Sequence, residues 1–196
     1  MPHVQNGERV GVIMGSDSDL PKLVPAAKIL DILGIEYKFG IKSAHRTPEE
    51  MMDYSKNAHN LGIKAIIAAA GGSAHLPGMV SSETIVPVFG VGIAKELDWM
   101  DASVASSVRM PPGVPLSFVG INESGATNAA LAAGRVIAQE DSDVREAYET
   151  YWANLQDEVR RKDALLGEIG PYEYTQLLKD VKAGSRDTVF SELKEQ

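Results

Sequence analysis

The residue types best suited to proton transfer and anion binding come together in one short segment, Ser43-Ala44-His45-Arg46-Thr47-Pro48. Histidine exchanges protons near neutral pH, and the arginine guanidinium is a permanent cation that binds phosphate or carboxylate. The segment follows an apolar run and has the pattern of a helix N-terminus, in which Thr47 is the expected N-cap and Glu50 its partner in a capping box. His45 and Arg46 are therefore expected at the carboxyl end of a strand, where parallel sheets bind ligands.

Two further polar segments follow apolar runs in the same way. Residues 15–19 (GSDSD) follow the run 9–14 and offer hydroxyls and backbone N–H groups at a helix N-terminus, which favours an anion. Residues 71–78 (GGSAHLPG) follow the run 65–70 and carry His75 among three glycines, which allow a planar ligand to approach the backbone closely. The three segments together predict one binding site.

Each of these segments also has a purely structural interpretation. Ser18 or Asp19 would serve as an ordinary helix cap, and Arg46 could pair with Glu49 or Glu50 on its own helix. A single histidine on a loop is more often structural than functional. Two histidines on neighbouring strand-end loops favour a functional site.

Apolar runs alternate with helical patterns along the chain. This alternation predicts an α/β fold, a three-layer sandwich with a central parallel sheet of flavodoxin-like type. The expected strands are residues 9–14, 36–41, 65–70, 86–91 and 116–121, and the expected helices between them are residues 21–33, 48–61 and 124–137, with a short one near Leu76.

A long amphipathic C-terminal helix is expected to follow, capped by Ser142 and ending near Leu166. Its aromatic residues, among them Tyr148 and Trp152, either pack on the chain's own sheet or form a subunit contact. We expect a flexible N-terminus at residues 1–8, a catalytic α/β domain at 9–166 and an extension of unknown role at 167–196.

Composition excludes several classes of function. The chain of 196 residues has a net charge of −8 and no cysteine. An acidic chain has no surplus of cations for nucleic-acid binding, so we expect no nucleic-acid partner. The absence of cysteine excludes disulfides and thiol nucleophiles and suits a reducing cytoplasm. No stretch is long and apolar enough to cross a membrane.

Other sites are weakly supported by the motifs. His45, His75 and Asp19 could form a two-histidine, one-carboxylate metal site, but no HxH or HExxH motif supports it, so we expect no metal. The GxSxG motif of serine hydrolases is absent, as are the GxGxxG and GxxxxGK[ST] motifs of nucleotide-binding loops.

Several segments together resemble one known family. Residues 15–19, 43–50 (SAHRTPEE) and 70–79 (AGGSAHLPGM) are similar to the site loops of 5-(carboxyamino)imidazole ribonucleotide mutase, an enzyme of purine biosynthesis. Residues 110–115 (MPPGVP) and 126–138 (ATNAALAAGRVIA) follow the same family pattern. The resemblance covers roughly residues 9–165.

The resemblance implies carboxyl transfer from the exocyclic nitrogen to ring carbon 4 of an aminoimidazole ribonucleotide. His45 would be the acid and base of the reaction, which needs no metal, ATP or biotin. The family assembles as an octamer with sites shared between subunits. The implied substrate contacts are Ser16, Ser18, Ser43 and Arg46 for phosphate, Asp19 for ribose, and Ala44, Gly71, Gly72, Ser73, Ala74, His75 and Leu76 for the base and CO2.

The sequence departs from the family pattern at two points. Gly90-Val91-Gly92 stands where GVP is usual, and Arg109-Met110-Pro111 where QMP is usual. A related class that fixes CO2 directly onto aminoimidazole ribonucleotide can carry arginine there, but it lacks the GGxAHLPG loop. The alternatives are thus direct carboxylation, a carboxylase acting on a different ring, and a non-catalytic nucleotide- or flavin-binding module.

Overall fold

A five-stranded parallel sheet forms the centre of the fold in the computed structural model, which describes residues 7–94 and 102–182. The strand order is β2-β1-β3-β4-β5, which is the flavodoxin-like order and confirms the predicted fold class. All the neighbouring strands are parallel, and β1 lies between its two partners with Val10 opposite Tyr37 and Ala65. The strands are β1 (Val10–Met14), β2 (Tyr37–Ile41), β3 (Ala65–Gly71), β4 (Val88–Ile93) and β5 (Ser117–Ile121).

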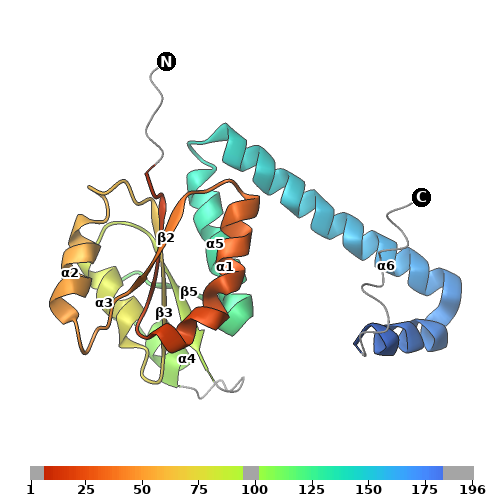
Figure 1. Ribbon diagram of the computed structural model, residues 1–196, viewed down its shortest axis with the longest axis horizontal. Coiled ribbons are helices and arrows are strands. Elements are labelled where there is room, and N and C mark those ends of the chain that lie inside the picture. Colours follow the sequence, from red (N-terminus) through yellow and green to blue (C-terminus); the bar gives the residue numbers. More distant parts are fainter. Residues whose placement is uncertain (1–6, 95–101, 183–196) are drawn as a thin grey trace. The chain divides into compact units, whose positions relative to one another are not determined.

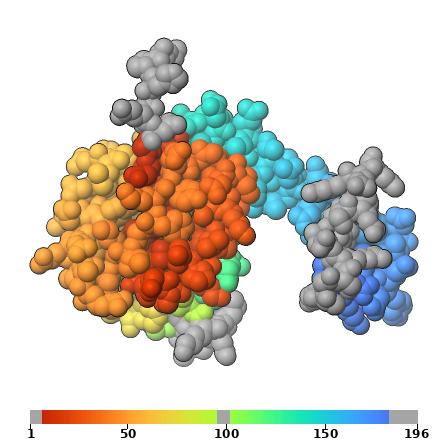
Figure 2. Space-filling model, viewed as in Figure 1, coloured from red at the N-terminus to blue at the C-terminus, as the bar shows by residue number. Residues whose placement is uncertain are grey.

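Helices cover both faces of this sheet. On one face α1 (Leu20–Ile32) packs against α5 (Asn122–Ile137), and on the other α2 (Pro48–Asn57) packs against α3 (His75–Glu83) (Figure 1). The short α4 (Ala102–Val108) contacts α3 and β4. The space-filling view shows α1, in red and orange, on the visible face of this part of the molecule (Figure 2).

The core is built around β3, in which residues 65–70 are buried without interruption. Such a continuous apolar strand is typical of a sheet covered on both faces. Four of these six residues are alanines, so the flanking helices can approach closely. Ile66 and Ile67 supply the larger side chains, and both are fully buried.

The start of α2 differs from the capping box that the sequence predicted. Thr47 is the N-cap residue, but its side chain caps no helical N–H group. Its Oγ1 instead accepts a hydrogen bond from the Ser43 N–H at 3.1 Å, inside the preceding loop. The predicted extent was also wrong, since α2 ends at Asn57 and a turn with Gly62 at φ +84° follows.

The C-terminal helix α6 (Ser142–Lys182) is longer than predicted and is interrupted at Gly170, whose φ is +76°. Pro171 then begins a second helical segment. The cap is Asp141 rather than Ser142, because Asp141 Oδ1 accepts hydrogen bonds from the N–H groups of Asp143 and Val144 at 3.0 and 3.1 Å.

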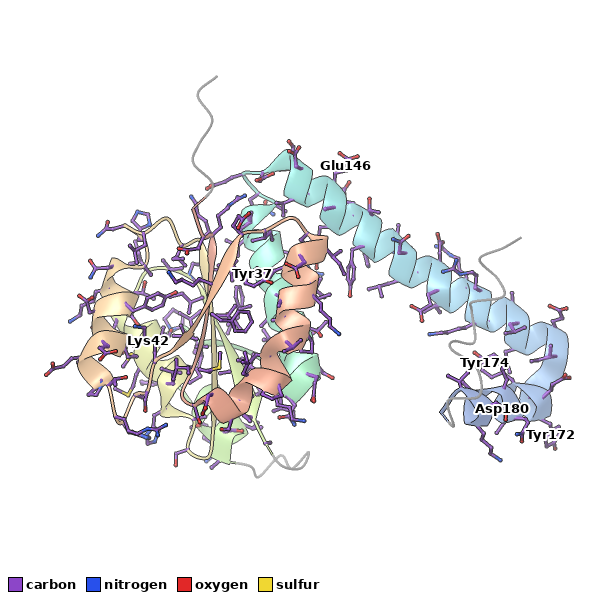
Figure 3. All side chains as sticks on the ribbon, viewed as in Figure 1. Tyr37, Lys42, Glu146, Tyr172, Tyr174 and Asp180 are labelled. Carbon is purple, nitrogen blue, oxygen red and sulfur yellow. The ribbon has the colours of Figure 1, made fainter. Side chains whose placement is uncertain are left out.

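The chain separates into two compact units, residues 1–149 and 150–196. In the second unit, Tyr174 and Asp180 lie on the helical segment after Gly170, and the Tyr172 side chain is 92% exposed (Figure 3). Most of the predicted flexible N-terminus and the end of the predicted extension lie outside the described residues. Within the described ranges, no helix combines the length and apolarity needed to cross a membrane.

Candidate active site

The loop after β1 forms a short 3-10 helix, η1 (Asp17–Asp19), which leads into α1. Ser16 caps it: its Oγ accepts from the Ser18 N–H at 3.3 Å, and the Ser18 hydroxyl lies 2.9 Å from the same oxygen. Asp19 takes the N-cap position of α1, but its side chain makes no capping hydrogen bond of the kind that a purely structural interpretation would require. Two hydroxyls and the adjacent N–H groups gather at this helix start.

Asp19 is the least exposed polar group of this loop, with a relative exposure of 9%. Burial raises the pKa of its carboxyl above the usual range, although hydrogen bonds from Ser18 and Ser16 act in the opposite direction. A carboxylate held in this way is a strong acceptor for hydroxyl groups of a ligand.

The loop after β2 holds Arg46 by contacts to two different loops. The Ser43 Oγ accepts from the Arg46 N–H at 3.2 Å and from its Nε at 3.4 Å. The Arg46 Nη2 donates to the Gly15 carbonyl at 3.2 Å, which joins the loop after β2 to the loop after β1. These contacts involve the loops rather than Glu49 or Glu50, so Arg46 lies between the two segments that the sequence predicted to converge.

The loop after β3 is shaped by residues in left-handed backbone conformation. Gly72 has φ +60°, and Ala74, directly before α3, has φ +43° and ψ +46°. A left-handed alanine is strained and occurs where the surrounding structure fixes it, often at functional sites. At Gly71 a Cβ would lie 2.9 Å from the Ile93 carbonyl oxygen, so only glycine fits there.

These two loops bring the two histidines into direct contact. His45 Nε2 and His75 Nδ1 are 2.7 Å apart, and the rings meet edge to face at 89° with centroids 4.9 Å apart. Since one nitrogen must donate and the other accept, the contact fixes complementary tautomers on the two rings. Both side chains remain solvent-exposed and can reach a ligand.

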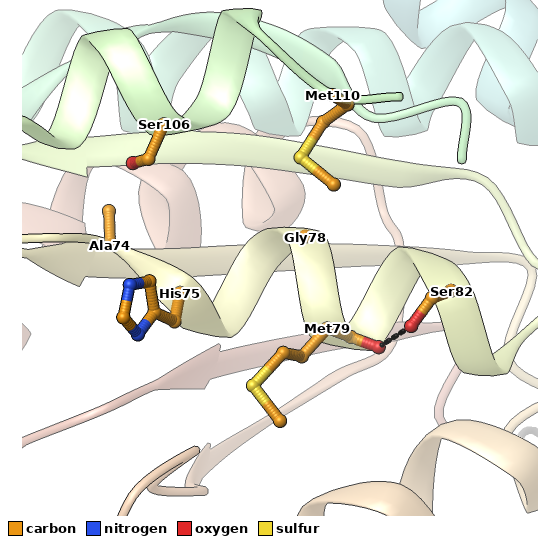
Figure 4. Close-up of a pocket in the computed structure, with 7 residues that line it drawn as sticks. All are labelled: Ala74, His75, Gly78, Met79, Ser82, Ser106 and Met110. Carbon is orange, nitrogen blue, oxygen red and sulfur yellow. Dashed lines mark hydrogen bonds between the residues drawn. The ribbon is translucent and has the colours of Figure 1, made fainter. Parts of the chain in front are cut away.

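A cavity of about 330 Å³ lies on the other side of His75, along α3. Ser106 and Met110 face α3 across it (Figure 4). Its hydroxyls are engaged with the backbone: Ser82 donates to the Met79 carbonyl at 2.8 Å and Ser106 to the Ala102 carbonyl at 2.7 Å. Apart from His75, the side chains that line the cavity are therefore apolar or already hydrogen-bonded to the backbone.

The remaining candidate residues divide between the surface and the core. Gly71, Gly72 and Ser73 are exposed in the loop after β3, whereas the Ala44 and Leu76 side chains are buried at 9% and 2% exposure. Leu76 can therefore meet a ligand only through its backbone N–H, which is one of the free donors of the first turn of α3. In the part of the chain that the structure describes, no cluster of three metal-ligating side chains occurs.

Sequence reasoning missed three features of this region. It gave no role to Met110 and Ser106, although the MPPGVP segment was noted as part of the family pattern. It predicted neither the bond from Arg46 to Gly15 nor the contact between the two imidazoles. Loop convergence could be foreseen from strand order, but a contact between two side chains depends on rotamers and loop conformation.

Comparison with known proteins places the three loops within one family match. The model of the AIR carboxylase family matches residues 9–158, which include all three loops. The chain belongs to the AIR carboxylase family. This result confirms the resemblance found in the sequence motifs.

Individual members of the AIR carboxylase family show how closely the chain follows it. N5-carboxyaminoimidazole ribonucleotide mutase of Thermotoga maritima is 47% identical over 167 residues, 85% of this chain and 96% of that protein. Phosphoribosylaminoimidazole carboxylase of Candida albicans is also 47% identical, over 84% of this chain but only 29% of that longer protein. The crystal structure of Treponema denticola PurE superposes with a TM-score of 0.72 at 29% identity, covering 80% of this chain and 97% of that one.

Proposed function

We propose that this chain transfers a carboxyl group from the exocyclic nitrogen to ring carbon 4 of an aminoimidazole ribonucleotide, the reaction of a 5-(carboxyamino)imidazole ribonucleotide mutase. The observation that carries the proposal is the 2.7 Å contact between His45 and His75, with Arg46 bonded to Gly15 beside it. The mutase relatives of Thermotoga maritima and Pyrococcus horikoshii, at 47% and 45% identity, support it.

The chemistry requires one group that gives a proton and later takes one back. A carbamate loses CO2 when its nitrogen gains a proton, so the first half of the reaction needs an acid. Carbon 4 of the ring then attacks CO2, and the proton on that carbon must leave to a base. His45 performs both steps in turn, which leaves its protonation state unchanged over one cycle.

His75 is the positioning residue for His45. The bond between the rings holds the His45 imidazole in one orientation and one tautomer, so that the nitrogen not engaged with His75 can face the substrate. This role follows from the geometry, because the bond occupies Nε2 of His45 and leaves Nδ1 for the reacting atoms.

The ribose phosphate binds between the loops after β1 and β2. Ser16, Ser18, Ser43 and Arg46 supply hydroxyls and a cation to the phosphate, and Asp19 accepts from the ribose hydroxyls. The buried position of Asp19 supports this role, since a ligand hydroxyl would replace solvent at that carboxylate.

The imidazole base and CO2 lie against the loop of Gly71, Gly72, Ser73 and Ala74 and against the backbone of His75 and Leu76, with Ala44 opposite. Close packing of this loop over the base would retain CO2 near carbon 4 and keep water away from it. We further propose that the enzyme works in the cytoplasm as a homo-octamer, which the family resemblance supports.

The test is to supply the purified protein with the carbamate substrate, without bicarbonate, and to follow formation of the carbon-carboxylated ribonucleotide. Wild-type protein is expected to turn over, and His45→Asn to lose about 10²-fold or more in kcat, the usual contribution of a general acid–base group. Binding of the substrate to His45→Asn, measured by calorimetry, should remain close to wild type.

Two results would contradict the proposal. Wild-type-like turnover by His45→Asn would remove His45 from the reaction. Product formed only from aminoimidazole ribonucleotide and added bicarbonate would favour direct carboxylation, the alternative suggested by Arg109 and consistent with the similarity to the Candida albicans carboxylase.

A further inference from the structure

Thr47 stands at the N-cap position of α2, but its side chain bonds to the loop before the helix. A threonine at this position ordinarily accepts a hydrogen bond from an N–H group of the first helical turn. Here the Thr47 Oγ1 makes no such bond and accepts from the Ser43 N–H at 3.1 Å. The hydroxyl therefore stabilises the loop after β2 in place of the helix start.

Three hydrogen bonds between Ser43 and Thr47 close a turn of five residues. Besides the contact at 3.1 Å, the Thr47 N–H donates to the Ser43 carbonyl at 3.0 Å, and the Thr47 hydroxyl donates to the same oxygen at 3.4 Å. Ser43 is only 9% exposed, so water has little access to its N–H group as a substitute partner. Thr47 thus holds both the N–H and the carbonyl of Ser43.

The Ser43 hydroxyl passes this constraint on to Arg46. Its Oγ accepts from the Arg46 N–H at 3.2 Å and from the Arg46 Nε at 3.4 Å. A hydroxyl has two acceptor sites and one hydrogen, and Arg46 takes both acceptor sites, so the hydrogen is left for an acceptor such as a phosphate oxygen. Arg46 in turn donates to the Gly15 carbonyl in the loop after β1.

We propose that Thr47 is a positioning residue for the phosphate of the substrate. It fixes Ser43, and through Ser43 the guanidinium of Arg46, in the arrangement that binds the phosphate. Thr47 itself does not touch the ligand, because its hydroxyl is engaged within the turn. This inference rests on the phosphate-binding role given to Ser43 and Arg46 under the proposed function.

The start of α2 does not depend on the Thr47 hydroxyl. The Thr47 carbonyl accepts the first helical bond, from the Met51 N–H at 3.1 Å, and Pro48 supplies a first helical residue with a fixed backbone angle. The described contacts of the hydroxyl are all to Ser43. Its removal should therefore act on the loop and leave the helix in place.

Thr47→Val tests the proposal, since valine keeps the branched shape and the backbone bond to Ser43 but lacks the hydroxyl. The KM for the carbamate substrate should rise about 3- to 10-fold, the effect of one net hydrogen bond. The value of kcat should stay within about twofold, because the phosphate is bound equally in the ground state and the transition state. Thr47→Ser retains the hydroxyl and should bring KM back to within about twofold of wild type.

Binding of ribose 5-phosphate, measured by calorimetry, separates this proposal from that of the reaction. Arg46→Ala should weaken binding whether or not the chain transfers a carboxyl group, and Thr47→Val should weaken it about 3- to 10-fold. Both losses in a protein that fails to turn over the carbamate would overturn the proposed function and support the role of Thr47. Weaker binding by Arg46→Ala with unchanged binding by Thr47→Val would overturn the role of Thr47.

A double-mutant cycle shows whether Thr47 acts through Ser43. Ser43→Ala removes the hydroxyl that links the turn to Arg46. In that background Thr47→Val should weaken ribose 5-phosphate binding by less than about twofold, because the link is already broken. If the two losses multiplied instead, Thr47 would act independently of Ser43, and the proposal would be wrong.

The matched control is Thr127→Val in α5. The Thr127 hydroxyl also bonds to a backbone oxygen, that of Glu123, at 3.0 Å, but it lies in none of the three site loops. Its KM and its binding of ribose 5-phosphate should stay within about twofold of wild type. Equal losses in Thr47→Val and Thr127→Val would show a general effect of removing a hydroxyl and would contradict the proposal.

Hydrogen exchange of the wild-type protein tests the turn without a substitution, which covers the case in which Thr47→Val fails to fold. The Ser43 amide, bonded to Thr47, should exchange much more slowly than the His45 amide, which donates in none of the described hydrogen bonds. Equally fast exchange of the two amides would show that the turn is open in solution and would overturn the proposal.

Discussion

His45 and His75 are 30 positions apart in the sequence, yet 2.7 Å separates their ring nitrogens. At the scale of single residues, the site depends on such contacts between loops. Arg46 is tied to Gly15 and Ser43, and Asp19 is buried at the start of α1. Each contact fixes a group whose chemistry would be weak if the side chain moved freely in solvent.

Removing the nitrogens of His75 should slow turnover without weakening substrate binding. For His75→Phe we expect kcat to fall about 10- to 100-fold, since a hydrogen bond to a charged group contributes roughly 1.5–3 kcal/mol and each 1.36 kcal/mol is tenfold. KM should change little. His75→Asn retains a polar atom near the Nδ1 position and should recover part of the rate, as measured by steady-state kinetics.

An unchanged kcat in His75→Phe would show that the contact between the imidazoles has no role in the reaction. A rise in KM with an unchanged kcat would instead make His75 a substrate-binding residue. The pH profile of kcat should also change shape in His75→Phe, which a purely structural role would not cause.

Asp19→Asn should stabilise the folded chain near neutral pH while weakening substrate binding. Because burial raises the pKa of Asp19 in the fold, the folded chain holds this proton more tightly than the unfolded chain. The charged form therefore lowers stability above the pKa of the unfolded state. Urea denaturation should give a higher free energy of unfolding for Asp19→Asn than for wild type at pH 7. The difference should shrink as the pH falls through the raised pKa of Asp19 toward the pKa of an ordinary aspartate.

The control for Asp19 is Asp17→Asn, an exposed neighbour in the same loop. It should change stability by less than about 0.5 kcal/mol. If Asp19→Asn destabilised the protein at pH 7, the carboxylate would be stabilising the loop, in contradiction to the burial argument.

At the scale of elements, helix starts decide where the functional groups lie. Ser16 caps η1, Ala74 precedes α3 in a left-handed conformation, and Asp141 caps α6. The first two lie in the candidate site loops, and the third fixes only the start of α6, through its ion pair with Arg9.

Loss of the Asp141 cap should destabilise the fold more than loss of the neighbouring hydroxyl. Asp141→Ala removes both the cap and the ion pair and should cost about 1–2 kcal/mol in the free energy of unfolding. Ser142→Ala should cost less than about 0.5 kcal/mol. Asp141→Asn should fall between them, because asparagine still caps but cannot pair with Arg9. Chemical denaturation at pH 7 compares the three.

The Asp141 carboxyl also makes the stability of the fold depend on pH. The Arg9 guanidinium, and then the backbone N–H groups, hold the pKa of Asp141 below its usual range. The stabilisation is therefore present at neutral pH and is lost as the pH falls through this lowered pKa. A difference between wild type and Asp141→Asn that stayed constant from pH 7 to acid would contradict this assignment.

At the scale of the whole molecule, the candidate site and most of α6 belong to different compact units. The three site loops lie within residues 1–149, and residues 150–196 form the second unit. The break at Gly170 divides the second unit again, into the helical segment before Gly170 and the segment that begins at Pro171.

Ending the chain after Gly170 should leave the reaction and the fold of residues 1–149 intact. We expect kcat and KM within about twofold of the full-length values, because no site loop is removed. Thermal unfolding and steady-state kinetics of the two lengths provide the comparison. A large loss of turnover with an unchanged melting temperature would instead assign residues 171–196 a part in the site.

The positions of the strands and of the polar loops that follow them were predictable from sequence because both are local signals. A continuous buried strand such as residues 65–70 and polar loops directly after it are visible in a short window of sequence. Helix starts were predicted less well. Thr47 and Ser142 are both residue types that cap helices, but Thr47 bonds to the Ser43 N–H instead, and Asp141 takes the place of Ser142 as the cap of α6.

The sequence by itself determined the α/β alternation, the parallel sheet and the three segments that carry His45, Arg46 and His75. Only the tertiary structure decided that the two imidazoles touch, that Arg46 reaches the Gly15 carbonyl and that the Leu76 side chain belongs to the core. The physical reason is that apolar periodicity specifies which elements form. The direction of a side chain at a loop depends instead on backbone angles and packing set by residues far away in the chain.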